Sequence, residues 1–172
     1  MQLQSSDFEI FGLPIAFALD RSQLDNRWKD LQRQYHPDRH IAADPQTQRQ
    51  TMQWSIRINE AYHRLKDPLR RAAYLCELHG TPVQAESNTT MPPAFLMQQM
   101  QWRETLEEAT TTAAIYTLAN QVTATRQRLL DDLHNTADQQ RDWPALAQQV
   151  RTLMFVERFV QDIQARLEHL GQ

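Results

Sequence analysis

Residues 31–40 read LQRQYHPDRH, and within them His36-Pro37-Asp38 separates two stretches of helical periodicity. Pro37 disfavours a helical conformation at His36, so the preceding helix must end there. The preceding apolar residues recur at helical spacing and predict a helix over residues 20–35: Leu24, Trp28, Leu31 and Tyr35. Asp44-Pro45 then signals the start of a second helix, whose apolar face holds Trp54, Ile58, Ala61, Tyr62 and Leu65. The two helices must run antiparallel to share one core, which predicts a helical hairpin.

Shorter helices are predicted on both sides of this hairpin. Residues 7–11 form a helical turn that Gly12 ends, and Asp67-Pro68 starts a further helix. That helix is expected to end at Gly80 and to bury Leu69, Ala72, Ala73, Leu75 and Leu78. Residues 81–92 combine Pro, Ser, Asn and Thr without a helical period, which is typical of a linker. We therefore expect a first domain over residues 1–80, a linker over 81–92 and a second domain over 93–172.

The second domain carries three helical patterns. The first helix is expected to start at Pro92-Pro93 and to run to about Ala109. The second covers residues 113–133, with these side chains facing inward: Tyr116, Ala119, Val122, Leu129 and Leu133. The third begins at Asp142 and has an apolar residue at every third or fourth position: Leu146, Val150, Leu153, Val156, Val160, Ile163, Leu167 and Leu170. These patterns predict a three-helix bundle and, for the chain as a whole, an all-α fold.

Composition excludes several classes of function. With 172 residues, 41% hydrophobic and 23% charged, the chain is typical of a soluble globular protein. Its three glycines are too scattered for a nucleotide-binding glycine loop. The single cysteine, Cys76, excludes an intrachain disulfide. It also gives no reason to expect a metal or another cofactor. The net charge of -3 gives no case for nucleic-acid binding. We see neither a signal peptide nor an apolar run long enough for a membrane span, so we expect a cytoplasmic protein without membrane contact.

The loop of the hairpin is a candidate binding site. On a helical wheel, Lys29 and Arg33 lie opposite the apolar face and lead into His36 and Asp38. The proline stiffens this loop, so a partner would bind it at little cost in ordering. An enzyme using His36 and Asp38 is the contrasting interpretation, but no nucleophile near them has a supporting pattern. We therefore expect no catalytic activity.

The first domain resembles a J-domain over residues 7–75. The resemblance is carried by DFEIFGL at residues 7–13, HPDR at 36–39, INEAY at 58–62 and LKDP at 65–68. It implies a co-chaperone that stimulates the ATPase of a DnaK-like chaperone. By resemblance, the residues that contact the chaperone are Lys29, Arg33, His36, Pro37 and Asp38. Arg39 stands where members of the family more often carry lysine, which keeps the charge.

The first helix of the second domain carries two apolar groups. Phe95, Trp102, Leu106 and Ala109 fall within about 60° of one another and form an ordinary core face. A second group lies roughly 150° away, beside Glu104; it consists of Leu96, Met97 and Met100. This group either packs against the first domain or forms an exposed binding patch. On the last helix, Phe155 lies about 100° from the centre of the apolar face. It either covers the edge of the core or belongs to an exposed binding patch.

Nearly the whole chain resembles the HscB family, the J-domain co-chaperones of iron–sulfur cluster assembly. Besides the J-domain motifs, the resemblance rests on LCELHG at residues 75–80, FLM at 95–97, LEE at 106–108 and the segment 150–155. It implies that the bundle binds the scaffold protein IscU and delivers it to the chaperone HscA. By resemblance, the scaffold-binding residues are Leu96, Met97, Met100, Glu104, Glu108 and Phe155. Gln98 and Gln101 replace typical acids, which weakens the electrostatic part of that patch.

A general J-domain co-chaperone for unfolded clients is the alternative. Such proteins usually carry a Gly/Phe-rich linker or zinc-binding cysteine repeats, and this sequence has neither.

Overall fold

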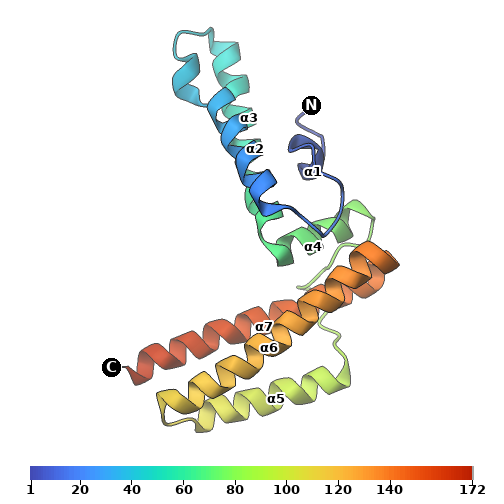
Figure 1. Cartoon of the computed structure of the whole chain (residues 1–172), viewed down its shortest axis with the longest axis vertical. Coiled ribbons are helices and arrows are strands. Elements are labelled where there is room, and N and C mark those ends of the chain that lie inside the picture. The colour runs from blue at the N-terminus through green and yellow to red at the C-terminus, as the bar shows by residue number, and fades with distance from the viewer. Residues whose placement is uncertain (172) are drawn as a thin grey trace. The chain divides into compact units, whose positions relative to one another are not determined.

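A computed structural model describes residues 1–171 of the chain. The chain folds into helices that form two compact units. The first unit is Met1–Leu75 and the second begins at Cys76, so the division falls within one helix, α4. The elements are α1 (Asp7–Ile10), α2 (Arg21–Gln34), η1 (Pro37–His40), α3 (Pro45–Lys66), α4 (Pro68–Leu78), α5 (Pro93–Glu108), α6 (Thr112–Asn135), η2 (Thr136–Gln140) and α7 (Trp143–Leu170). Figure 1 shows the α2–α3 hairpin and the α5–α6–α7 bundle, and no strand occurs among residues 1–171. The all-α prediction is confirmed.

The helix starts agree with the capping signals in the sequence. Asp20 accepts a hydrogen bond from the backbone N–H of Gln23 at the start of α2, and Asp44 accepts one from Thr47 at the start of α3. Each cap satisfies a backbone donor that the first turn leaves without a helical partner. The predicted starts of these helices are therefore confirmed within one residue.

A buried ion pair fixes α1 against α3. The Asp7 carboxylate is fully buried and lies 2.7 Å from a nitrogen of Arg57 and 3.2 Å from one of Arg64. Arg57 also donates to the backbone carbonyls of Leu3 and Ser5. Removing one partner of a buried ion pair costs about 3–5 kcal/mol, so this cluster holds the N-terminal segment in place.

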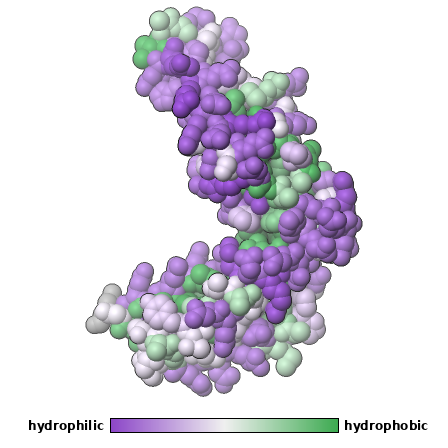
Figure 2. Space-filling view, viewed as in Figure 1, coloured by the Kyte–Doolittle hydropathy of each residue, from purple (hydrophilic) through white to green (hydrophobic). Residues whose placement is uncertain are grey.

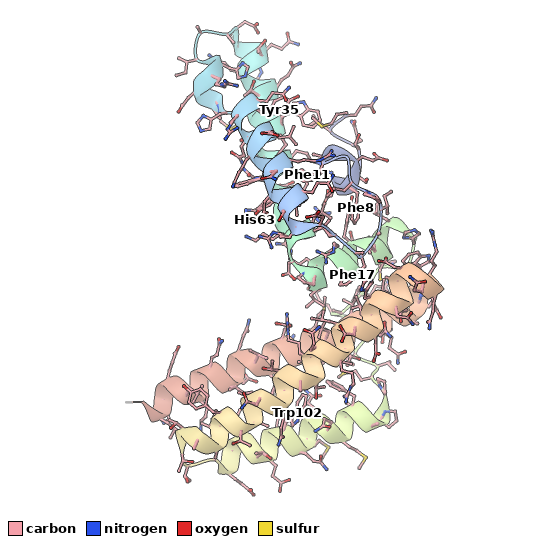
Figure 3. The ribbon with its side chains drawn as sticks, in the orientation of Figure 1. Phe8, Phe11, Phe17, Tyr35, His63 and Trp102 are labelled. Carbon is pink, nitrogen blue, oxygen red and sulfur yellow. The ribbon has the colours of Figure 1, made fainter. Side chains whose placement is uncertain are left out.

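The apolar side chains of the α2–α3 hairpin are less buried toward its loop. Leu24 is fully buried, but Trp28, Leu31 and Tyr35 are only half-buried. The reason is that α1 packs against α3 beside Arg57 and does not reach the loop end (Figures 1 and 3). There, ring packing replaces a closed core, with the Tyr35 and Trp54 rings 5.5 Å apart between centroids. The loop end of the hairpin is thus an exposed two-helix structure.

In the second unit, the bundle core is centred on α7. Trp102 of α5, labelled in Figure 3, stacks on Phe159 of α7 with 5.6 Å between ring centroids, and both side chains are buried. The interior also contains Ile115, Leu118, Val122, Leu133, Leu146, Val150, Leu153, Val156 and Ile163. The predicted three-helix bundle is confirmed, and the apolar face of α7 includes Phe159, which the sequence pattern missed.

The inward face predicted for α6 was partly wrong. Tyr116 is 59% exposed, whereas Ile115 and Leu118 are buried. Ile115, Leu118, Val122 and Leu133 fall within about 60° on a helical wheel, and Tyr116 lies about 100° from Ile115. Leu78 of α4 is likewise exposed rather than buried.

Two regions between helices are more ordered than the sequence indicated. The turn η2 connects α6 to α7 and ends at Arg141, whose φ of 54° places it in the left-handed region. Within residues 81–92, Val83 is buried and its carbonyl accepts a hydrogen bond from Arg151 of α7 at 2.9 Å. The segment after α4 is therefore attached to α7 at this point.

Within residues 1–171, we find no helix of the length and apolarity needed to cross a lipid bilayer.

Candidate functional sites

The His36-Pro37-Asp38 loop forms a single turn with a defined shape. His36 is extended, with φ −69° and ψ 131°, and the turn η1 follows directly. The His36 ring nitrogen Nδ1 accepts a hydrogen bond from the Asp38 backbone N–H at 3.2 Å, and the His36 carbonyl accepts one from Arg39 at 3.0 Å. The sequence predicted the end of α2 at this point but not the regular turn after it.

Side chains from both sides fasten this turn to the helices. Arg39 donates to the Arg33 carbonyl at 3.0 Å, and a ring nitrogen of His40 lies 3.2 Å from the Gln34 carbonyl, so both hold the turn to the end of α2. Gln48 of α3 donates to the carbonyl of Ile41 at 2.8 Å from the other side. A turn held in this way is preorganised, which lowers the entropy lost when a partner binds.

The functional groups of the loop point into solvent. The Asp38 side chain is 80% exposed, and its carboxylate lies 3.6 Å from His36 Nδ1. Lys29 and Arg33 are exposed on α2, as predicted. The loop therefore offers a carboxylate and an imidazole beside a basic helix face, which is suited to charge-assisted contact with another protein.

The second candidate site is the outer face of α5. Leu96, Met97 and Met100, which we call the α5 stripe, are 43%, 64% and 71% exposed. A groove of about 450 Å³ follows part of this stripe and is lined by Met97, Met100, Gln101, Arg103, Glu104 and Glu107. The stripe is thus not covered by the other helices of the bundle. Arg103 and Glu107 were not among the predicted residues, although both lie on the outer face of the same helix.

The stripe extends toward Phe155 of α7. The α5 and α7 helices run parallel, because Trp102 stacks on Phe159 and Arg103 pairs with Asp162 at 3.5 Å. Phe155, one turn before Phe159, is therefore level with about residue 98 of α5. Leu96 lies two turns before Arg103, on the side of α5 that faces α7.

The charged groups of this site stay in solvent. Glu104 and Glu108 are exposed, and Phe155 is half-buried with the Arg158 guanidinium 5.4 Å from its ring centroid. An apolar stripe with carboxylates beside it is suited to bind a protein surface that is both apolar and basic. Among residues 1–171, no group of three or more His, Cys, Asp or Glu side chains is placed to hold a metal ion.

A helical hairpin with His-Pro-Asp at its tip, followed by a separate three-helix bundle, defines a J-domain protein with a second domain of its own. Residues 91–164 match the family model described as the HSCB C-terminal oligomerisation domain. The chain is 47% identical to a co-chaperone HscB homologue of Bordetella petrii, over 92% of this chain and 94% of that one. It is 44% identical to the homologue of Burkholderia multivorans, over 99% and 98% of the two chains.

Solved structures agree with these relatives. The chaperone HscB from Vibrio cholerae matches with a TM-score of 0.84 and 36% identity, over 96% of this chain and 99% of that one. The human co-chaperone HscB has the same fold, with a TM-score of 0.90 at 24% identity over 96% and 83% of the chains. The chain belongs to the HscB family of co-chaperones.

Proposed function

We propose that this protein stimulates the ATPase of a DnaK-like chaperone of the HscA type and delivers the iron–sulfur scaffold IscU to it. The observation that carries the proposal is the exposed and preorganised His36-Pro37-Asp38 loop on a chain of the HscB family. The protein acts in the cytoplasm, in the maturation of iron–sulfur proteins. It regulates a partner and performs no hydrolysis itself.

The loop and the face of α2 bind the chaperone. Asp38 accepts a charge-assisted hydrogen bond from an arginine of the partner, a contact with fixed geometry. Lys29 and Arg33 attract an acidic surface and raise the association rate more than the affinity. Stimulation requires that the loop binds one conformation of the chaperone more tightly than another, because a ligand shifts an equilibrium only by its differential affinity.

The α5 stripe, Glu104, Glu108 and Phe155 bind the scaffold. The three residues of the stripe supply apolar area that folding leaves in water, and the carboxylates select a basic partner surface. Because the proposed chaperone site lies in the first unit and the scaffold site in the second, one molecule has a separate surface for each partner.

The test is a reconstituted ATPase assay with purified HscA, IscU and this protein. The wild type is expected to raise the ATPase rate of HscA, and His36→Gln or Asp38→Asn to abolish the increase without lowering the melting temperature, since both side chains are exposed. Loss of stimulation with a melting temperature many degrees lower would show that these residues are structural and would contradict the proposal.

Client choice separates the proposal from its alternative. We expect IscU to bind the protein and to add to the stimulation, and a reduced, unfolded polypeptide to do neither. Equal effects of the two clients would indicate a general J-domain co-chaperone instead.

A further inference from the structure

Exposed apolar side chains after the His-Pro-Asp turn and on α3 have no role in the proposed function. Ile41 is 72% exposed and Met52 of α3 is 49% exposed. Single exposed apolar residues are common and need no explanation. These two, however, line the same hollow of about 250 Å³, together with Pro37 and the buried Thr51, and Asp38 also lines it. Figure 2 shows apolar surface at this end of the hairpin.

From this hollow we infer that the chaperone places one aliphatic side chain between Ile41 and Met52 while a neighbouring basic residue of the chaperone pairs with Asp38. This inference rests on the proposed function, since it concerns the same contact. The HscA interface would then have an apolar part beside the electrostatic part formed by Lys29 and Arg33.

The size and lining of the hollow favour an aliphatic side chain with a basic neighbour as its occupant. Pockets for small molecules usually measure about 300–1,000 Å³, so a hollow of about 250 Å³ fits a side chain better than a separate ligand. Its apolar lining residues, Pro37, Ile41 and Met52, favour an aliphatic group. Asp38 and His40 also line it, a ring nitrogen of His40 lies 3.2 Å from the Gln34 carbonyl, and no lysine or arginine is among the lining residues, so a basic residue of the partner fits best beside the aliphatic one.

Met52 of the hollow lies on the same side of the hairpin as Gln32 of α2. Gln32 of α2 donates a hydrogen bond to Asn59 of α3, which joins the two helices at one side of the hairpin. Met52 lies two turns before Asn59 on α3, and Lys29 lies about 60° around α2 from Gln32. A partner that covers the loop and this side of the hairpin therefore meets Lys29 and Met52 together.

The hollow is preformed and needs no rearrangement to accept a side chain. Gln48 of α3 donates to the carbonyls of Ile41 and Ala43, at 2.8 Å and 3.2 Å, and so fixes the segment that carries Ile41. An apolar side chain that enters a preformed site loses contact with water without an ordering cost in this protein.

The test is a titration of HscA ATPase stimulation with the full-length double variant Ile41→Gln/Met52→Gln. Glutamine is close in length to methionine and forms helices well, so the melting temperature is expected to stay at the wild-type value. The concentration for half-maximal stimulation is expected to rise on the order of tenfold, because most of the apolar contact is lost. The maximal stimulated rate is expected to persist, because His36 and Asp38 are intact.

Two controls make the result specific. Ile15→Gln replaces another exposed apolar residue of the first unit, in the loop before α2 at the other end of the hairpin, and is expected to leave the titration unchanged. Ile41→Leu/Met52→Leu keeps the hollow apolar and is expected to retain wild-type stimulation. If the glutamine variant melts lower, the single variant Met52→Gln is titrated instead and is expected to show a smaller rise in the same direction.

The possible outcomes also separate this inference from the proposed function. Stimulation by the wild type with an unchanged titration for the folded glutamine variant would overturn the inference alone. No stimulation by the wild type would overturn the proposed function first. A loss shared by Ile15→Gln would show a general effect of surface polarity and would also overturn the inference.

Discussion

Truncation of the α5 stripe is expected to weaken scaffold binding without destabilising the bundle. In the variant Leu96→Ala/Met100→Ala, two side chains that are 43% and 71% exposed lose their apolar atoms. The core face of α5, which includes Trp102 and Leu106, is untouched. Alanine is the best helix former, so α5 itself is retained.

The size of the effect follows from the exposed fractions. Complete burial of a leucine or methionine side chain contributes about 1.5–3 kcal/mol. Only the part that folding leaves exposed is available for binding, which is 43% of Leu96 and 71% of Met100. The pair therefore contributes about 2 kcal/mol, and the dissociation constant for IscU is expected to rise by roughly thirtyfold.

Calorimetric titration with IscU measures this change directly, and a thermal melt of each variant accompanies it. Tyr116→Ala is the matched control, because Tyr116 is a large exposed apolar residue of the same bundle on another helix. The control is expected to bind IscU with wild-type affinity. Stimulation of HscA without IscU is expected to be unchanged in both variants, since the first unit is intact.

Two results would refute this reasoning. Wild-type affinity of the double variant would show that the α5 stripe is not the scaffold site. A melting temperature several degrees lower would show that the stripe supports the fold, and the loss of affinity would then have a structural cause.

Two further predictions concern charge and pH. Arg33→Glu is expected to raise the concentration for half-maximal HscA stimulation by about tenfold at low salt and by clearly less at 0.5 M salt. The reason is that Arg33 is exposed, so salt screens its attraction to the chaperone. An effect that is the same at both salt concentrations would contradict this role. Burial raises the pKa of the Cys76 thiol from 9.0 to about 12, so the unfolded chain loses this proton at a lower pH than the folded one. The free energy of unfolding is therefore expected to fall between pH 9 and pH 12. This fall is expected to be steeper in the wild type than in Cys76→Ala, by up to about 1.4 kcal/mol per pH unit. Urea unfolding at each pH measures it, and the same dependence of the free energy on pH in both proteins would contradict the assignment.

The hairpin could be predicted from the sequence because its signals are local. Asp20, Asp44 and Pro37 each act on the backbone within a few residues, so they fix where a helix begins or ends without knowledge of the rest of the fold. The periodicity of apolar residues then indicates which face is buried. Neither signal depends on a distant part of the chain.

The features that the sequence missed depend on contacts between distant segments. Arg57 reads as one more charge on an amphipathic helix, but it pairs with Asp7, 50 residues earlier in the chain. Gln48 likewise gives no local sign that it holds the loop through the Ile41 carbonyl. Such bonds satisfy polar groups that only the tertiary structure brings together.

The face of α6 was misjudged for a different reason. An aromatic residue is a strong indicator of burial, but Tyr116 lies about 100° around the helix from the buried Ile115, so including it shifted the predicted face by about a tenth of a turn. Tyrosine tolerates exposure because its hydroxyl group is solvated while its ring covers neighbouring surface. The aliphatic residues Ile115, Leu118 and Val122 give the correct face because they lack a polar end.

The structure places Gln98 and Gln101, the two glutamines that the family resemblance singles out on α5, beside different cavities. Gln101 lines the groove along the α5 stripe, where an acid would add negative charge to that of Glu104 and Glu107. Gln98 lines a different cavity, of about 470 Å³, beside Phe95 and Leu129, and it does not line the stripe's groove. If the groove is the scaffold site proposed above, we therefore expect only Gln101 to lower its attraction for a basic partner surface. Because exposed charges contribute mainly to association rate, we expect this replacement to leave the apolar part of the affinity with Leu96, Met97 and Met100.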